Sequence, residues 1–377
     1  MRIVITGASG NVGTALLRRL ARRGDTPGEK ENGSAAGNGD GSSGRHEIVG
    51  ICRRPPSGGP PYADARWVAL DLAGPAVEAA LTPVLDGADA VVHLAWGFQP
   101  AHDISYLARL GVDGTRAVVN AAQAAGVPHL VHMSSVGAYS PGPDDDRRVD
   151  ESWPTGGIDS LAYSRQKVAA ERVLDEHERA HPDGTAVARL RPALIVQRDS
   201  GSALLRYGVP PYVPAALLRH LPLLPVDREL VVPLVHTSDV ADAIVRVLEQ
   251  RATGPFNLAA EPPVTRDLIA AVLHAWPVHL PRTVLHTVAD VAWRLRLQPL
   301  DPGWIDLAFA VPLLDCGRAR RELGWTPAVT ADAALAQVVG GMADSAATTS
   351  PALRPRSVPA ELAAIARGEP ITSRRLP

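Results

Sequence analysis

The sequence is poor in cysteine, in net charge and in long apolar runs, and each shortage excludes a class of protein. The two cysteines among 377 residues, Cys52 and Cys316, are too few for a disulfide framework or a zinc site. No apolar stretch reaches about 18 residues, the length that predicts a membrane-spanning helix. The formal net charge is −2 and the basic blocks are short, so we expect neither nucleic acid nor an anionic membrane as a partner.

Further absences concern metals and targeting. The 12 histidines show no metal-ligand spacing, which predicts chemistry without a metal. The first expected strand begins at residue 2 and leaves no room for a signal peptide, so we expect a cytoplasmic protein. The expected partner is a small-molecule substrate, and a homodimer is compatible with the sequence.

Lysine is the scarcest charged residue, because the chain has two lysines and otherwise carries its positive charge on arginine. One of them, Lys167, follows Tyr163 by four positions, so on a helix the two side chains share a face. A compact ammonium there favours the ionised phenol and lowers its pKa from about 10 toward neutrality. Tyr163 is therefore a candidate acid and base. The alternative is an amphipathic helix in which the two residues are merely neighbours.

A second motif lies at the N-terminus, where residues 2–5 have the pattern of a buried strand and lead into the glycine-rich run 6–13. Gly7 permits a tight turn, Gly10 lets the backbone approach a pyrophosphate, and Gly13 allows the next helix to pack closely. Phosphates would rest on the N-terminus of that helix, at Asn11 and Val12. The alternative is a purely structural turn.

The motifs Gly7-x-x-Gly10-x-x-Gly13 and Tyr163-x-x-x-Lys167 together resemble the short-chain dehydrogenase/reductase superfamily. The glycine spacing and the length are similar to its extended branch, the NAD-dependent epimerase/dehydratase family, over about residues 1–340. Segments with the same resemblance follow in order at 89–95, 111–115, 130–139, 191–192, 235–241, 256–258 and 321–327. Asp113 stands where the family usually has asparagine or a similar polar residue.

The resemblance implies roles for individual residues. Ser135 would be the catalytic hydroxyl, and Lys167 would hold the nicotinamide ribose as well as lower the pKa of Tyr163. Cofactor contacts would come from strand ends, at Asp71, Leu72, Leu94, Ala95 and Pro192. A serine at the carboxyl end of an apolar strand also points into the crevice where open α/β sheets bind ligands. The alternatives are that Ser134 and Ser135 only cap a turn, and that Asp71 is an ordinary helix N-cap.

The alternation of strand and helix patterns predicts an α/β fold, a doubly wound parallel sheet of the NAD(P)-binding Rossmann type with a smaller C-terminal substrate lobe. The expected strands are 2–6, 47–52, 66–70, 89–95, 129–135 and 186–191. Residues 1–192 would form the cofactor domain, and 232–250 would return to its sheet. Residues 193–231 and 255–342 would form the lobe. We expect 26–45 to be a flexible insertion and 343–377 a mostly disordered tail with one short helix near 360–367.

Cofactor choice depends on the residues after the second strand. Arg53 and Arg54 stand where an NAD-selective site would place a carboxylate, and an arginine can pair with a 2'-phosphate. We therefore expect NADP(H) to be favoured, with NAD(H) possible. The alternative is that both arginines are ordinary surface charges.

Substrate identity is less well defined. Trp96, Phe98 and Gln99 follow the fourth strand at the mouth of the crevice. Polar candidates in the lobe are Arg198, Tyr207, Tyr212 and His236. Taken singly, each of these residues is more often a core or surface residue than a ligand contact. Residues 193–199 depart from the Tyr-Gly-Pro type of turn that sugar-nucleotide enzymes of the family usually have, which weakens that assignment.

The sequence thus predicts a nicotinamide-dependent oxidoreductase, in which Tyr163 exchanges a proton with a carbonyl or alcohol while hydride moves to or from the cofactor. A nucleotide-sugar epimerase or dehydratase is the alternative within the same fold. A non-catalytic dinucleotide-binding regulatory module is the alternative from another class. The joint presence of Ser135, Tyr163 and Lys167 argues against the last.

Overall fold

The computed structural model describes residues 1–24, 46–97, 104–208, 215, 221–298, 300–357 and 359. The expected insertion at 26–45 and the expected helix near 360–367 lie outside these residues. So do Phe98, Gln99 and Tyr212.

The described residues contain a seven-stranded sheet of order β10-β6-β5-β4-β1-β2-β3, in which every pair of neighbours is parallel. Its strands are β1 (Arg2–Thr6), β2 (Glu47–Cys52), β3 (Arg66–Ala69), β4 (Ala90–His93), β5 (His129–Met133), β6 (Ala186–Pro192) and β10 (Gly254–Leu258). The six strands expected from the sequence are all present. The expected fold class is confirmed.

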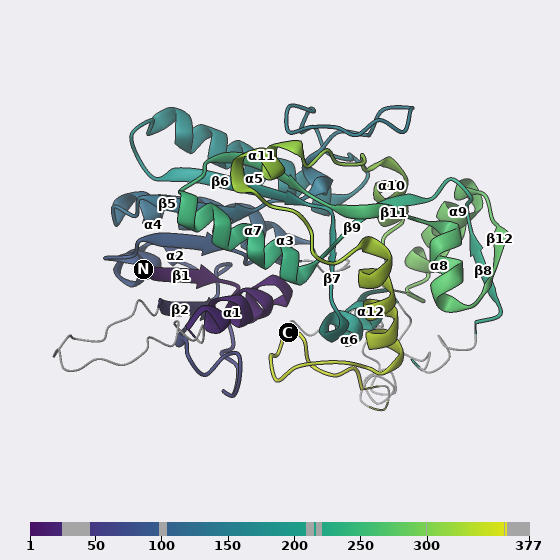
Figure 1. Ribbon diagram of the computed structural model, residues 1–377, viewed down its shortest axis with the longest axis horizontal. Helices are drawn as coiled ribbons and strands as arrows, with labels where there is room; N and C mark the ends of the chain where they lie inside the picture. The colour runs from purple at the N-terminus through teal and green to yellow at the C-terminus, as the bar shows by residue number, and fades with distance from the viewer. Residues whose placement is uncertain are drawn as a thin grey trace, which may run out of the picture.

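Helices cover both faces of this sheet (Figure 1). One face carries α1 (Asn11–Gly24), α7 (Thr237–Gln250) and α11 (Gly317–Leu323), and the other carries α2 (Val77–Leu85), α4 (Gly114–Ala124) and α5 (Ala162–Ala180). The alternation within β1 shows why. Ile3 and Ile5 pack with the α1 and α7 side, whereas Val4 packs with the α2 and α4 side, as a period of two requires.

A smaller lobe lies beyond the carboxyl ends of the strands. Its three-stranded sheet has the order β11-β9-β7, from β7 (Leu194–Val196), β9 (Val231–His236) and β11 (Ala260–Thr265). A two-stranded sheet pairs β8 (Leu223–Val226) with β12 (Trp276–His279). The helices of this part are α6 (Gly201–Gly208), α8 (Arg266–Leu273), α9 (Arg282–Arg294), α10 (Gly303–Ala310) and α12 (Ala331–Ala343). In Figure 1, β8, β12, α8 and α9 lie at the end of the molecule opposite β2.

Short helical segments complete the described chain. They are α3 (Ser105–Ala108), the π-helical η1 (Arg109–Asp113), and the 3-10 turns η2 (Val136–Ala138) and η3 (Arg198–Ser200). None of the helices in the described ranges has the length and apolar character needed to cross a membrane.

The strands β9 and β10 do not belong to the sheets expected for them: β9 lies in the small sheet and β10 in the large one. Residues 232–250 were expected to return to the large sheet, but β9 pairs with β7 and β11 in the small one, and only α7 lies on the large sheet, against α1. The returning strand is instead β10, which pairs with β6 although 255–342 was assigned to the lobe. Both segments are short apolar runs, and such runs predict a strand without specifying its partner.

The expectation of a loose tail from 343 is wrong for its first part. Ser350 is fully buried, and its hydroxyl donates to the carbonyl oxygen of Ser9 in the glycine-rich turn. Leu353 is 2% exposed. The hydroxyls of Thr348 and Tyr62 are hydrogen-bonded at 3.1 Å. The segment around residues 348–353 is therefore held by local turns and by a few buried contacts. Its serine, threonine and proline content does not predict such packing.

Candidate active site

The glycine-rich turn has the geometry of a phosphate cradle. Gly7 has a φ of +71°, and a Cβ there would stand 2.7 Å from the backbone nitrogen of Ala95. At Gly13 a Cβ would stand 2.4 Å from the carbonyl oxygen of Ala8, so α1 can pack this closely only with glycine. Gly10 and the first residues of α1, Asn11 and Val12, line a cavity. These residues fit the pyrophosphate of a dinucleotide at a helix N-terminus.

Asn11 also ties this turn to the smaller lobe. Its side-chain oxygen accepts a hydrogen bond of 2.7 Å from the Gln197 amide, and its own amide donates to the Ile195 carbonyl oxygen at 3.4 Å. The expected cofactor contacts Leu94 and Pro192 line the same cavity. The cradle therefore lies where the lobe meets the large sheet.

Beyond the second and third strands, where the adenosine part of the cofactor is expected to bind, the structure has an interaction that was not predicted from the sequence. Arg53 donates to the Tyr106 hydroxyl at 3.1 Å, and that hydroxyl donates to Asp71 at 3.0 Å. Asp71 also accepts from the backbone nitrogen of Ala73, in a turn rather than at a helix N-cap. Arg54 is exposed, whereas Leu72 is buried. A cation, a phenol and a carboxylate thus meet beyond the ends of β2 and β3.

Ser135 and Tyr163 are brought together beyond β5. Ser135 caps the η2 turn, because its oxygen accepts from the backbone nitrogen of Gly137 at 3.0 Å. It is also hydrogen-bonded to the Tyr163 phenol. The capping role and the contact with the tyrosine are therefore both present, and both side chains line the cavity.

The pKa of Tyr163 differs from the expectation. Burial raises it to about 12, and the hydrogen bond from Ser135 only partly offsets this. Lowering of this pKa by Lys167 is not seen, since the ammonium lies 5.9 Å from the centre of the tyrosine ring and is itself buried. Desolvation outweighs a neighbouring cation here.

Lys167 is 2% exposed and donates to the Met133 carbonyl oxygen at 2.8 Å. Its ammonium also lies 3.4 Å from the ring centre of Trp96, a cation–π contact. Burial lowers the pKa of Lys167 well below its ordinary value, while Glu171 acts in the opposite sense. Trp96 thus lines the cavity with its indole against the lysine.

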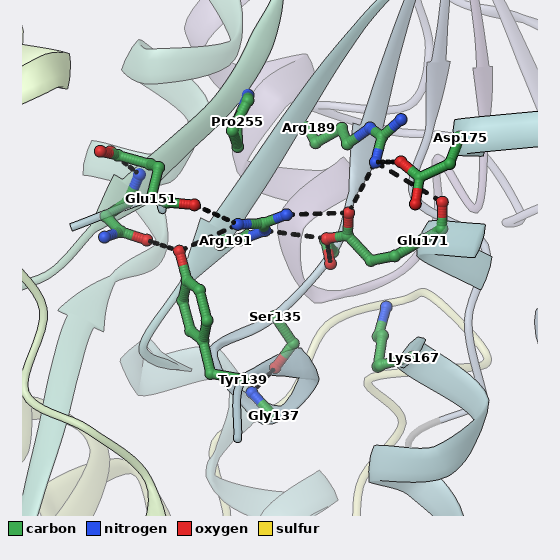
Figure 2. A network of polar contacts seen from close by, with 12 residues as sticks. Ser135, Gly137, Tyr139, Glu151, Lys167, Glu171, Asp175, Arg189, Arg191 and Pro255 are labelled. Atoms are coloured by element: carbon green, nitrogen blue, oxygen red, sulfur yellow. Dashed lines mark hydrogen bonds and ion pairs between the residues drawn. The ribbon is translucent and has the colours of Figure 1, made fainter. Parts of the chain in front are cut away.

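A buried ionic network lies close to Ser135 and Lys167 (Figure 2). Glu171, one turn after Lys167 on α5, accepts from Ser134 at 2.5 Å and from two nitrogens of Arg191 at 2.9 and 3.0 Å. Arg189 donates to the same carboxylate at 3.0 Å. Burial would raise the pKa of Glu171, but the two arginines outweigh it and lower the pKa to about 2. The network fixes α5 against β6 and the turn after β5.

The sequence analysis did not identify Glu171 or Arg189. Their signal was available, because Glu171 continues the four-residue spacing of Tyr163 and Lys167, and Arg189 and Arg191 share one face of β6. These two spacings together indicate that Glu171 of α5 could pair with an arginine of β6.

The cavity has a volume of about 400 Å³ and continues past Tyr163 into the lobe. Trp304 of α10 lies there with its ring centre 5.3 Å from that of Tyr163 and tilted by 34°. Leu307 and Val311 extend the same wall. These residues could not be predicted as neighbours of Tyr163, since nothing in their local pattern connects them with it.

One expected substrate contact, Arg198, is not brought to this cavity. Arg198 forms an ion pair with Asp344, has a side chain 52% exposed, and is not among the residues that line the cavity. Among the described residues there is no group of three acidic, histidine or cysteine side chains that could hold a metal ion.

Comparison with known proteins identifies a family whose model matches most of the chain. The model of the "NAD dependent epimerase/dehydratase family" matches residues 3–259. An uncharacterised protein of Mycobacterium tuberculosis is 29% identical over 338 residues, which are 89% of this chain and 29% of that protein. The chain thus spans about 29% of the length of the first curated relatives it matches.

Two further proteins are similar along nearly their whole length. A 3-diazoavenalumate denitrifying reductase of a Streptomyces species is 27% identical over 339 residues, 87% of this chain and 96% of that protein. A dTDP-glucose 4,6-dehydratase from Streptomyces venezuelae, solved with NAD, has a TM-score of 0.64 at 20% identity and covers 91% of this chain and 97% of that one. The family model covers more than half of the chain and agrees with the resemblance read from its motifs. The chain belongs to the NAD dependent epimerase/dehydratase family.

Proposed function

We propose that this chain is an NAD(P)-dependent oxidoreductase that transfers hydride to or from a carbonyl or alcohol, with Tyr163 as acid and base. One observation carries the proposal. Ser135, Tyr163 and Lys167 line a single cavity together with Gly10 and the N-terminus of α1. A phosphate cradle and a proton-transfer pair thus share one space.

In this proposal the cofactor and three side chains have separate roles. The bound cofactor supplies or accepts the hydride. Ser135 donates to the substrate oxygen, while Tyr163 gives that oxygen a proton in reduction and removes it in oxidation. Lys167 would hold the nicotinamide ribose of a bound cofactor. The raised pKa of Tyr163, about 12, keeps the phenol protonated at neutral pH, which is the state that a proton donor needs in reduction.

NADP(H) is the preferred cofactor in this proposal. Arg53 would pair with the 2'-phosphate, and its guanidinium is held against Tyr106. Titration of the purified protein with NADPH and NADH should show tighter binding of NADPH. Arg53→Ala should remove the preference, and Arg116→Ala, which breaks an exposed ion pair on α4, is the matched control. Equal affinity for both cofactors, or no effect of Arg53→Ala, contradicts the proposal.

The relatives support an enzyme of this chemistry without fixing the substrate. The Streptomyces relative is named a reductase, and the Streptomyces venezuelae structure is a nucleotide-sugar dehydratase with NAD. Epimerisation or dehydration of a nucleotide sugar is therefore the second candidate. A small-molecule substrate, a cytoplasmic location and a homodimer complete the proposal.

A substrate panel separates these candidates. Carbonyls, alcohols and nucleotide sugars are incubated with the enzyme and cofactor, and both cofactor absorbance and products are followed. The proposal expects a net change in absorbance equal to the product formed. Product without net cofactor change would instead indicate an epimerase or dehydratase. Neither signal across the panel would indicate a dinucleotide-binding module.

A further inference from the structure

The part of the cavity beyond Tyr163 is walled by apolar and aromatic side chains. Trp304, Leu307 and Val311 come from α10 and the residue after it, and Leu194, Leu204 and Pro233 come from β7, α6 and β9. This wall is thus assembled from separate elements of the lobe. Such a surface gains free energy by removing apolar groups from water.

Trp304 is held firmly beside the proposed acid. Gly303 is buried, and a Cβ there would stand 2.8 Å from the Ser160 carbonyl oxygen, so α10 packs directly on the segment that leads into α5. The Gly142 nitrogen donates to the carbonyl oxygen of Ala310 at 2.8 Å, which anchors the other end of α10. The helix that carries Trp304 is therefore anchored at both ends beside Tyr163.

The same wall offers little to an anion. Among the described residues that line the cavity, Lys167 is the one side chain with a formal charge, and it is engaged by Met133 and Trp96. Arginines of the adjoining elements face other partners: Arg198 pairs with Asp344, and Arg18 pairs with Asp199 at 2.7 Å. The described part of this wall therefore supplies none of the bidentate arginine partners that a diphosphate needs.

We propose that the substrate is an uncharged aromatic aldehyde or ketone whose ring lies against Trp304, Leu307 and Val311. This substrate class rests on the proposed oxidoreductase function. The carbonyl carbon gains hydride from the reduced nicotinamide cofactor, and the oxygen gains the Tyr163 proton, so C=O becomes CH–OH and the cofactor is left oxidised. Tyr163 then regains a proton from solvent. Offset or tilted ring contacts with Trp304 favour an aromatic over a saturated ring.

Matched probes test the substrate class. Benzaldehyde and cyclohexanecarbaldehyde differ chiefly in aromaticity, and UDP-glucose represents the nucleotide sugars. We expect kcat/KM to be at least about 10-fold higher for benzaldehyde than for cyclohexanecarbaldehyde, and no turnover of UDP-glucose. Equal efficiency on both aldehydes overturns this inference but leaves the proposed function standing. Turnover of UDP-glucose with no reduction of any aldehyde overturns both.

Variants locate the ring. Trp304→Ala should raise the KM for benzaldehyde about 10-fold, whereas Trp304→Phe should stay close to the parent enzyme because it keeps an aromatic face. Trp276→Ala is the matched control, since that tryptophan is 78% exposed on β12. Quenching of intrinsic fluorescence by benzaldehyde in the presence of NADP⁺ reports binding without turnover. Benzaldehyde that does not bind, or an unchanged KM in Trp304→Ala, contradicts the proposal.

Discussion

Two histidines beneath the site remain uncharged in the folded chain. His93 lies between Thr6 and Thr115, whose hydroxyls are 2.7 and 3.0 Å from its two ring nitrogens. The Thr115 hydroxyl donates to the Gly111 carbonyl oxygen, so it accepts from Nε2 of His93, and Nδ1 accepts from Thr6. His132 is 1% exposed, and within the described part of the chain neither of its ring nitrogens has a hydrogen-bond partner.

These histidines predict a loss of stability in mild acid. Burial, followed by the charge of Lys167, lowers the pKa of His93 to about 3, and burial lowers that of His132 well below its ordinary value. Between about pH 6.5 and 3 the unfolded state therefore holds more protons than the folded state, and stability falls as pH falls. The expected slope is about 1.4 kcal/mol per pH unit for each histidine.

Urea unfolding between pH 7 and 5 measures this slope. His132→Phe should reduce the slope by about 1.4 kcal/mol per pH unit, while His181→Asn, at an exposed position, should leave it unchanged. A stability that does not vary between pH 7 and 5 would show that both rings accept protons in the folded state.

At the scale of elements, helix α5 carries both the proposed chemistry and its support. Tyr163, Lys167 and Glu171 follow one another at four-residue spacing, and the last is buried with Arg189 and Arg191. Removing one member of a buried ionic network leaves the others charged and desolvated. The rigidity of the turn that bears Ser134 and Ser135 depends on this carboxylate.

Glu171→Gln should therefore lower the free energy of unfolding by about 3–5 kcal/mol. Glu176→Gln on the same helix removes a pair with Arg116 in which both side chains are about half exposed, and it should cost less than about 1 kcal/mol. Urea denaturation of the two variants makes the comparison. Similar, small losses would mean that the buried carboxylate is not the anchor of α5.

The elements that the sequence predicted are those with strong local patterns. The strand and glycine turn at residues 2–13, the Tyr163 and Lys167 pair and the other five expected strands follow from spacing and apolar runs. The pairing of β9 and β10 and the position of Trp304 could not be predicted, because they depend on contacts between residues far apart in the chain. The raised pKa of Tyr163 also depends on burial, which spacing alone does not give.

At the scale of the whole molecule, the chain returns near residue 350 to the glycine-rich turn that follows its first strand. Residues near Ser350 lie on the glycine-rich turn, and Leu353 lines the cavity. Arg206 of α6 donates to the Ala352 carbonyl oxygen at 2.9 Å and so joins this segment to the lobe. The first turn, the lobe and the segment at 346–357 therefore close the cavity together.

Ending the chain at residue 346 should lower the melting temperature and weaken NADPH binding several-fold, because the contacts of Ser350 and Leu353 are lost. A chain ended at residue 359 keeps this segment and is the matched control. Calorimetry and cofactor titration of both proteins give the result. Unchanged melting and affinity in the shorter chain would show that the segment contributes nothing to the site.

The central claim is that Tyr163 transfers the proton, and the most direct test is the steady-state rate of Tyr163→Phe with a confirmed carbonyl substrate, measured beside its NADPH affinity. The variant keeps the ring and its contacts with Trp96 and Trp304 but has no proton to give. The account predicts a fall in kcat of about 100- to 10,000-fold with NADPH affinity nearly unchanged. Full activity in the variant would contradict it.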